Sequence, residues 1–443
     1  MAETMAGLGV LKRGALFLGA LACAGILCAL FAAAQAGAAW SPPTTIANTH
    51  GAGFTQVAMD SAGDSVFAWR QGGEAGTEID TRARMSNGTL SPVQRIARPG
   101  DVASDADFDV DPAGNAYYVW QSTDLQSTTN AFQIRARVRS AGGTLGPIVT
   151  LAKVKSGDFL GDPVVAAGAN GRAVFMWIRG DFHDHPDVIH ARKLSASGQL
   201  GPVRTVARAS FAEQQMAVDG SGNATFVWEQ RKDGRPALLT RTLTSGGGLT
   251  TPERVSQAGH AAGNPRVGMT PDGRTVFEWQ DNAAGTSDQV LITRGRSADG
   301  TMQAPQVLAN EGSANVSFAV SPNGASVTCW TSGAHGGLRA RSRTFGGTLS
   351  PMLAVTPSYD SLCAPGTDSD GNLVLAWTAS DGNKDRVYAR SGPAGGRLGP
   401  ARALSPAGFH ANFVDVAIAT GPTVPVVWTA GKRGFAVQGA FGP

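Results

Sequence analysis

The segment at residues 222–231, GNATFVWEQR, contains the pattern that organises the whole chain. Its apolar run ends on Trp228, and a similar phrase ends on a tryptophan seven more times, at Trp69, Trp120, Trp177, Trp279, Trp330, Trp377 and Trp428. The consecutive spacings are 51, 57, 51, 51, 51, 47 and 51 residues. A nearly constant period of this length indicates an array of one supersecondary unit.

Each tryptophan closes the second strand of a predicted hairpin. Seven of the eight follow a glycine by six residues, in turn-forming segments such as DSAGD at 60–64 and DGSGN at 219–223. Glycine suits the positive φ angles of such turns. The strand before the turn alternates apolar residues with a small one, as in Met216-Ala217-Val218. The small residue favours a strand that lies close to a neighbour.

Two more strands complete the unit. The third carries an arginine, as in LLTRTLT at 238–244, and the fourth follows a Leu-x-Pro signal, as in LGPVRTVA at 200–207. The repeated arginines are Arg82, Arg137, Arg192, Arg241, Arg294, Arg341 and Arg390. The second strand is apolar on both faces, and no segment beyond the leader is typical of a helix. We therefore expect neighbouring sheets to cover both faces, as in a propeller.

The two ends of the chain complement each other. The last unit stops at AFGP, residues 440–443, where its fourth strand should begin, and AWSPPTTIA at 39–47 has the sequence of that strand. Pairing the two would close the ring and remove an exposed sheet edge. The sequence therefore predicts an all-β, eight-bladed β-propeller of four-stranded blades, closed by the N-terminal strand. We expect residues 37–443 to form this single domain.

The repeated tryptophans and arginines have a structural explanation. The separation from tryptophan to arginine within a blade is always odd, between 11 and 17 residues. In an antiparallel hairpin with an even loop this places both side chains on one face. We expect each tryptophan to make a cation–π contact with its own arginine, worth about 0.5 to 2 kcal/mol. The alternative is a ring of aromatic platforms for sugars, which the sequence favours less because few ligands need eightfold contacts.

The first 36 residues differ from the rest of the chain. Lys12 and Arg13 precede an uncharged run at 14–34, and an Ala-Gln-Ala site at 34–36 follows. This pattern favours a cleaved export signal. The run is also long enough for a membrane anchor, and lipid attachment at Cys23 is a third alternative. We expect a secreted or cell-envelope protein, tethered through residues 14–34 if the leader is retained.

Charge and cysteine content limit the function further. The formal net charge is +3 and only 16% of the 443 residues are charged, which argues against a nucleic-acid partner. Without the leader, Cys329 and Cys363 are the remaining cysteines. They fall in consecutive repeats, and the sequence favours two buried thiols over a disulfide, although an exported protein can form one.

The hairpin motif gives a resemblance to known repeats. DPAGNAYYVW at 111–120 and DGSGNATFVW at 219–228 resemble the Asp-x-x-Gly-Asn hairpin of NHL-type and related bacterial secreted β-propeller repeats, and the blade length is similar to that of kelch repeats. The resemblance implies the fold and an extracellular setting. It implies no activity, and the sialidase Asp-box, the kelch glycine pair and the WD40 dipeptide are absent from the sequence.

The loops between second and third strands vary in length, and such loops carry function on rigid scaffolds. The most unusual is RGDFHDHPDVIH at 179–190 in the third repeat. It contains the candidate ligand-binding residues Asp181, His183, Asp184, His185 and Asp187. Imidazole and carboxylate groups suit a divalent metal such as zinc. The sequence nevertheless favours a solvated polar loop, because no regular element fixes the spacing of these ligands.

Catalytic signatures are missing from the sequence. It contains no Gly-x-Ser-x-Gly, P-loop or His-Glu-x-x-His motif, and Tyr117 and Tyr118 occupy apolar strand positions. We therefore expect a non-catalytic recognition or scaffold module, monomeric and without a cofactor, that binds an extracellular protein or glycan. The alternative is a glycosidase or lyase that uses loop carboxylates such as Glu74, Glu78, Asp181 and Asp187.

Overall fold

The computed structural model describes residues 40–49, 51–73, 76–97, 101–124, 132–154, 157–181, 186–209, 213–232, 234–282, 289–333, 336–357, 362–368, 370–380, 382, 384–393, 398–408, 410–417, 423–431 and 436–442. The predicted leader lies outside these ranges. Within them, no helix has the length and apolarity needed to cross a membrane.

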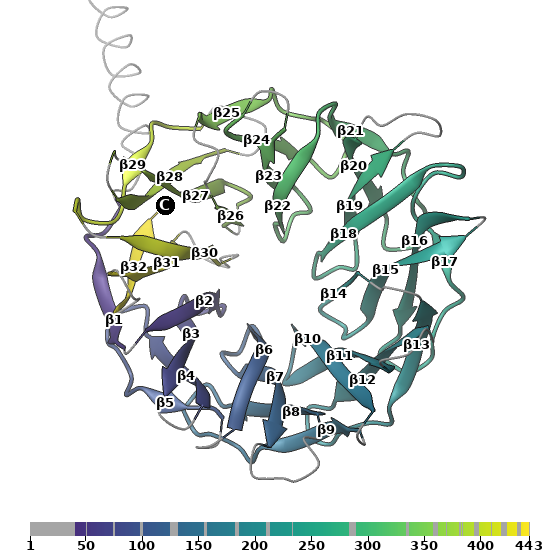
Figure 1. Cartoon of the computed structure of the whole chain (residues 1–443), viewed down its shortest axis with the longest axis horizontal. Helices are drawn as coiled ribbons and strands as arrows, with labels where there is room; N and C mark the ends of the chain where they lie inside the picture. The colour runs from purple at the N-terminus through teal and green to yellow at the C-terminus, as the bar shows by residue number, and fades with distance from the viewer. Residues whose placement is uncertain are drawn as a thin grey trace, which may run out of the picture.

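The described residues form eight four-stranded antiparallel sheets arranged in a ring, as Figure 1 shows. The prediction of an eight-bladed β-propeller is confirmed. In each blade the first strand lies nearest the axis and the fourth lies at the outer rim. Blades are numbered from 1 to 8 in chain order, starting with the sheet β2-β3-β4-β5.

The innermost strands are β2 (Ala52–Met59), β6 (Asp101–Val110), β10 (Asp158–Gly168), β14 (Gln214–Val218), β18 (Ala261–Met269), β22 (Ser313–Val320), β26 (Cys363–Thr367) and β30 (Ala411–Val416). The second strands are β3 (Ser65–Gly73), β7 (Ala116–Asp124), β11 (Arg172–Asp181), β15 (Ala224–Lys232), β19 (Thr275–Asn282), β23 (Ser326–Ser332), β27 (Leu373–Ser380) and β31 (Val424–Ala430). The third strands are β4 (Gly76–Arg84), β8 (Phe132–Arg139), β12 (Asp187–Leu194), β16 (Arg235–Leu243), β20 (Gln289–Arg296), β24 (Leu338–Arg343), β28 (Asp385–Gly392) and β32 (Ala436–Gly442). The outer strands are β5 (Gln94–Arg95), β9 (Val149–Lys153), β13 (Arg204–Ala209), β17 (Glu253–Arg254), β21 (Gln306–Ala309), β25 (Leu353–Thr356), β29 (Arg402–Ala403) and β1 (Thr44–Asn48).

The N-terminal strand closes the ring as predicted. β1 pairs antiparallel with β32, with Thr44 opposite Gly439, and completes blade 8 from its outer side. Ser41 extends the pairing, because its backbone N–H donates to the carbonyl oxygen of Phe441 over 2.8 Å. Arg82 of blade 1 donates to the carbonyl oxygen of Ile46 over 2.6 Å. The first and last blades are therefore linked through β1.

The eight repeated tryptophans lie in the core between blades. Their exposed fractions lie between 0 and 3%. Each closes a run of buried residues on the second strand, where neighbouring sheets cover both faces. A ring this deeply buried has no face on which a sugar could stack.

The repeated arginines join neighbouring blades through backbone carbonyls. Arg241 donates from Nε to the carbonyl of Thr250 in its own blade (2.8 Å) and from Nη1 to that of Val206 in the preceding blade (2.9 Å). The same two-blade pattern recurs at Arg82, Arg137, Arg192, Arg294 and Arg341. Hydrogen bonds from a charged donor contribute about 1.5 to 3 kcal/mol each.

The predicted tryptophan–arginine contact is therefore wrong. Phe67, two residues before Trp69, lies opposite Arg82, so the two repeated side chains do share a face. Among the described residues, however, none of the cation–π contacts joins a repeated arginine to a repeated tryptophan. The guanidinium groups bind carbonyl oxygens instead, because a planar donor can satisfy two acceptors that the blade edges leave exposed.

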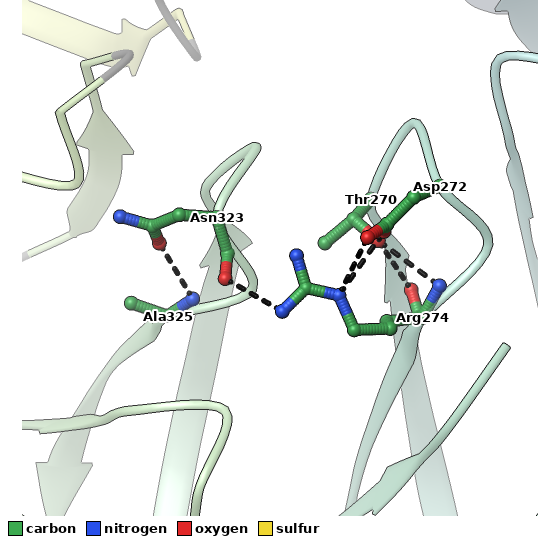
Figure 2. A network of polar contacts seen from close by, with 5 residues as sticks. All are labelled: Thr270, Asp272, Arg274, Asn323 and Ala325. Carbon is green, nitrogen blue, oxygen red and sulfur yellow. Dashed lines mark hydrogen bonds and ion pairs between the residues drawn. The ribbon is translucent and has the colours of Figure 1, made fainter.

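Neighbouring hairpin turns are also linked at one end of the ring. Figure 2 shows Arg274, in the turn between β18 and β19, bound to the carboxylate of Asp272 and to the carbonyl of Asn323 in the next blade. The same guanidinium lies over the ring of Phe345, 4.9 Å from its centre. This end of the ring is occupied by short turns and contacts between blades.

Cys329 and Cys363 form a disulfide, which corrects the expectation of two free thiols. Cys329 lies on β23 of blade 6 and Cys363 begins β26 of blade 7, with their Cα atoms 6.4 Å apart. Stacking of consecutive blades brings the two positions together, although they are 34 residues apart in sequence. The bond adds a covalent link between two blades.

Candidate functional site

The innermost strands share a β-bulge near their first residues. The strand pairing shifts register there in β2, β6, β10, β18, β22 and β30. One residue in each bulge has a positive φ angle: Phe54 (50°), Asp105 (41°), Asp162 (46°), Asn264 (53°), Asn315 (50°) and Phe413 (51°). Six blades therefore hold a residue other than glycine in the left-handed conformation at one equivalent place.

This place lies fifteen residues before the repeated tryptophan, where blades 4 and 7 carry Glu213 and Leu362. We call the eight residues the collar: Phe54, Asp105, Asp162, Glu213, Asn264, Asn315, Leu362 and Phe413. All eight are exposed. They lie at the start of the strands nearest the axis, at the end of the ring opposite the short hairpin turns. The second strands also end here, so the collar shares its face with the variable loops.

The chemistry of the collar changes in blocks around the ring. Blades 2, 3 and 4 carry three carboxylates in succession, and blades 5 and 6 carry two amides. Blades 7, 8 and 1 carry Leu362, Phe413 and Phe54, which are 48, 47 and 38% exposed. We call the first block the acidic arc and the last the apolar arc. The collar is therefore amphipathic across the axis.

Two collar residues have a backbone conformation that is energetically unfavourable for their residue type. Asparagine and aspartate visit the left-handed region with little penalty, whereas a phenylalanine there is held at a cost of order 1 to 2 kcal/mol. Phe54 and Phe413 nevertheless occupy it. Only part of each side chain packs against the fold in return, because Phe54 and Phe413 are 38 and 47% exposed. Such an outlier indicates a role outside folding.

A cavity of about 500 Å³ lies beside the acidic arc and spans blades 2 to 5. Its walls include Asp105, Asp162, Glu213 and Asn264 of the collar, together with Asp107 and Arg266 one step deeper on the same strands. Each of these four blades contributes residues from equivalent positions at the start of its inner strand. The cavity is thus formed by the inner strands of four blades rather than by one long loop.

The carboxylates around this cavity influence one another. Partial desolvation by the surrounding strands raises the pKa of Asp162, and the negative charge of Asp105 raises it further. Burial and the charge of Glu213 likewise raise the pKa of Glu229 on β15 of the same blade. Closely placed carboxylates disfavour each other's ionised form. The acidic arc therefore has a concentration of negative charge that the nearly neutral chain lacks as a whole.

A second layer of carboxylates joins inner strands below the collar. Asp107 accepts the backbone N–H of Val165 (2.9 Å) and Asp109 that of Ala167 (2.8 Å), both from blade 3. Asp415 accepts the N–H of Val57 across the closure between blades 8 and 1 (2.9 Å). Burial raises the pKa of Asp107 and of Asp415 to about 6, and that of Asp109 to about 7.

Two of the candidate loop residues lie near the collar. Asp181 ends β11 and Asp187 begins β12. Burial raises the pKa of Asp187, with further contributions from the charges of Asp162 and Asp181. His183, Asp184 and His185 lie outside the described residues. Within the part of the chain that the structure describes, no group of three or more His, Cys, Asp or Glu could hold a metal ion.

The other residues named from the sequence are engaged elsewhere. Glu78 pairs with Arg95 over 2.6 Å, and Glu74 lies outside the described residues. Tyr117 and Tyr118 are 1% exposed and hydrogen-bonded, Tyr117 to Asp111 and Tyr118 with Thr81. Neither tyrosine is accessible to a substrate.

One polar pair outside the collar was not found from the sequence. His260 Nδ1 lies 2.7 Å from Asp281, whose other oxygen accepts the indole N–H of Trp279 over 2.7 Å. Through this contact Asp281, which is 2% exposed, fixes the orientation of the His260 ring. It is a local variant of the repeated tryptophan environment, since Gln230 accepts the indole N–H of Trp228 at the equivalent place.

The collar itself was also missed by sequence reasoning. The available signal was the alignment of the eight repeats on their tryptophans, in which the position fifteen residues earlier varies while the residue before it is often Ala or Gly. The variation resembled that of an ordinary loop. In six blades a bulge holds this residue at a positive φ angle, and such a bulge depends on strand pairing, which the residue type at one position does not reveal.

No protein-family model and no curated protein matches this sequence. The structure is similar to polysaccharide lyase Uly1, with a TM-score of 0.49 and 9% identity over 87% of this chain and 89% of that one. It is also similar to an ulvan lyase bound to its oligosaccharide (TM-score 0.48, 10% identity, 90 and 95% coverage). The β-propeller domain of the Trilobed protease from Pyrococcus furiosus gives a TM-score of 0.47 at 8% identity, over 77% of this chain and 93% of that domain. These likenesses concern the fold alone.

Proposed function

We propose that this chain is an extracytoplasmic, non-catalytic recognition module that binds its ligand at the collar. The observation that carries the proposal is the contrast between constant and variable positions. Tryptophan recurs at its position in all eight blades, whereas the collar position carries five residue types. Six of the eight collar residues have a positive φ angle, which suits asparagine and aspartate better than phenylalanine. A side chain that the blade does not need, and that faces solvent beside the axis, is available for recognition.

The proposed setting outside the cytoplasm has two independent supports. The leader has the pattern of an export signal or anchor. The disulfide between Cys329 and Cys363 is of a kind that persists in oxidising compartments. The resemblance of the hairpins to NHL-type secreted propeller repeats agrees with this setting.

Binding at the collar is tested by screening the full chain against oligosaccharides and peptides, in parallel with two variants. The first, Asp105→Asn with Asp162→Asn, removes charge from the acidic arc. The second, Asp299→Asn, removes one charge from an exposed turn at the opposite end of the ring and serves as control. A ligand retained by the control and lost by the collar variant supports the proposal. Identical binding profiles for all three proteins contradict it.

A second candidate function is hydrolysis or elimination of a carbohydrate. The specific observation is a carboxyl with a raised pKa, Asp107 at about 6, in a cavity that also contains Asp105 and Asp162. Glycosidases use two carboxyls whose environments separate their pKa values. Release of new reducing ends or unsaturated sugars by the full chain, abolished in Asp107→Asn, would establish this function. Binding without any product excludes it for the ligand tested.

A further inference from the structure

The acidic side of the collar contains a buried acceptor without a donor. Gln214 begins β14 in the wall of the cavity and is 8% exposed. Its Oε1 accepts no hydrogen bond from the residues that the structure describes. A buried amide oxygen without a donor is unfavourable, and a ligand that donates an N–H to it removes the penalty. This observation is independent of the charges and points to a ligand that carries a hydrogen-bond donor.

The charged residues around the same cavity indicate that the ligand carries a positive charge. Asp105, Asp162 and Glu213 follow one another on three neighbouring blades. Arg266 in the cavity wall donates to the carbonyl of Val316 in the next blade, and the charge of Glu213 favours its ionised form. Asp105 and Asp162 are therefore the carboxylates that contribute most to the attraction of a cationic ligand. Carboxylates attract a guanidinium or ammonium group and repel uronate, sulfate or sialate groups. An anionic polysaccharide is therefore a poor fit.

The apolar arc lies on the other side of the collar and favours an apolar group of the ligand. Leu362, Phe413 and Phe54 come from three neighbouring blades. The bulges of blades 8 and 1 are joined, because Thr55 Oγ1 donates to the carbonyl oxygen of Phe413 over 2.6 Å. Exposed apolar side chains on adjacent blades gain free energy when a ligand covers them. A neutral sugar uses aromatic faces, but it gains little from a leucine or from three adjacent charges.

We propose that the collar binds a cationic peptide segment, an inference that rests on the proposed function and names its ligand class. An arginine or lysine side chain of the peptide enters the cavity, where it pairs with Asp105 and Asp162 and donates to Gln214. An apolar side chain of the same peptide covers Phe413 and its neighbours. Charge selects the ligand and apolar burial adds affinity, so both features must be present in one segment.

The probe is a fluorescein-labelled octapeptide of alternating arginine and leucine, tested on the full chain by fluorescence anisotropy. Two matched peptides each remove one feature: glutamine replaces arginine in the first, and serine replaces leucine in the second. We expect the complete probe to bind at least about tenfold more tightly than either matched peptide, a difference of about 1.4 kcal/mol. We expect added salt to weaken binding of both arginine-containing peptides.

Three variants locate the contact. Asp105→Asn with Asp162→Asn should weaken the complete probe about tenfold or more, whereas Asp299→Asn at the opposite end should leave it unchanged. Phe413→Asn should weaken the arginine–leucine probe and leave the arginine–serine peptide as it was. Melting curves confirm that each variant is folded, which the exposure of the collar favours. Equal affinity for all three peptides, or equal weakening by Asp299→Asn, overturns the proposal.

The same proteins separate this inference from the proposed function. A neutral oligosaccharide that binds the full chain and is lost in the Asp105→Asn, Asp162→Asn variant retains the collar as the binding site and overturns the peptide as its ligand. If neither peptides nor oligosaccharides respond to the collar variants, both the inference and the proposed function fail.

Discussion

The two ends of the innermost hairpins solve the same backbone problem with different residues. At the turn end, seven blades place a residue with φ between 74 and 90° six positions before the tryptophan, and all seven residues are glycine. At the collar end, six blades also hold a residue at positive φ, and none is glycine. Glycine adopts this conformation without penalty, whereas phenylalanine does not. The turn end is therefore optimised for the fold, and the collar end accepts a cost that folding does not explain.

The largest expected effect concerns the repeated tryptophans of the core, which are the same in all blades. Trp228→Ala should lower the free energy of unfolding by about 3 to 5 kcal/mol, because it leaves a large cavity between two sheets. Urea denaturation followed by circular dichroism measures the change. If the variant keeps its stability but loses a ligand, the tryptophan belongs to the binding surface and the distinction between constant and variable positions is wrong.

At the turn end we expect a moderate loss. In Gly222→Ala, the added Cβ would lie 3.5 Å from the nearest side-chain atom, which is ordinary contact. The left-handed backbone is then the remaining obstacle, and it costs about 1 to 2 kcal/mol in a residue other than glycine. Thermal unfolding should show a lower melting temperature. An unchanged melting temperature would show that the turn tolerates a side chain, and the contrast between the ends would lose its basis.

At the collar end the sign of the effect should reverse. Phe413→Asn places a residue that tolerates positive φ where a costly one stands, and it should raise the free energy of unfolding by up to about 1 kcal/mol. Asn315→Phe, the matched exchange on blade 6, should lower it by a similar amount. Opposite shifts in melting temperature support the strain argument. A fall in stability for Phe413→Asn would indicate that its ring packs more than its exposure suggests.

The middle of the same strands offers a test through pH. The carboxyl of Asp109 has a pKa of about 7 in the folded protein and about 4 in an unfolded chain. Between these values the folded state binds more protons, so its contribution to stability is present below about pH 4 and is lost as the pH rises to 7. Asp107 and Asp415 act in the same direction up to about pH 6.

The expected result is a melting temperature that falls as the pH rises from 5 to 8, with a weaker dependence in Asp109→Asn. The variant keeps an oxygen to accept the N–H of Ala167. Asp299→Asn, at an exposed turn, should keep the slope of the original protein over this range. A slope unchanged in Asp109→Asn would show that Asp109 is ionised throughout.

The blade architecture was predictable because it is written in repeated residues. Trp228 and its equivalents mark second strands, glycines mark turns, and the segment at 39–47 has the sequence of the missing strand. The hydrogen bond from Arg241 to the preceding blade was not predictable, because its acceptor is the backbone carbonyl of Val206 and a backbone acceptor leaves no pattern in the sequence. The disulfide also escaped prediction, because its formation depends on how blades 6 and 7 stack.

The candidate site was predicted only in part. Sequence reasoning placed function on the face of the variable loops and chose the third repeat, and Asp187 does lie where the charge of Asp162 affects its pKa. The collar could not be found in this way, since its eight members lie about fifty residues apart and become neighbours only when the ring closes. Local motifs reveal sites that one segment builds, and this site is built by all segments together.

The closure of blade 8 by β1 has a practical consequence for attaching the protein to something else. Because β1 is the outermost strand of its sheet, Trp40 and Ser41 lie at the outer rim of the ring, away from the inner strands that carry the collar. Because β1 runs antiparallel to β32 and Ser41 pairs with Phe441, a fusion partner, an affinity tag or a surface linkage joined ahead of Trp40 would hold the molecule by the outer rim of its turn end. The collar end would face away from the attachment, so an immobilised sample presents that end to a ligand in solution.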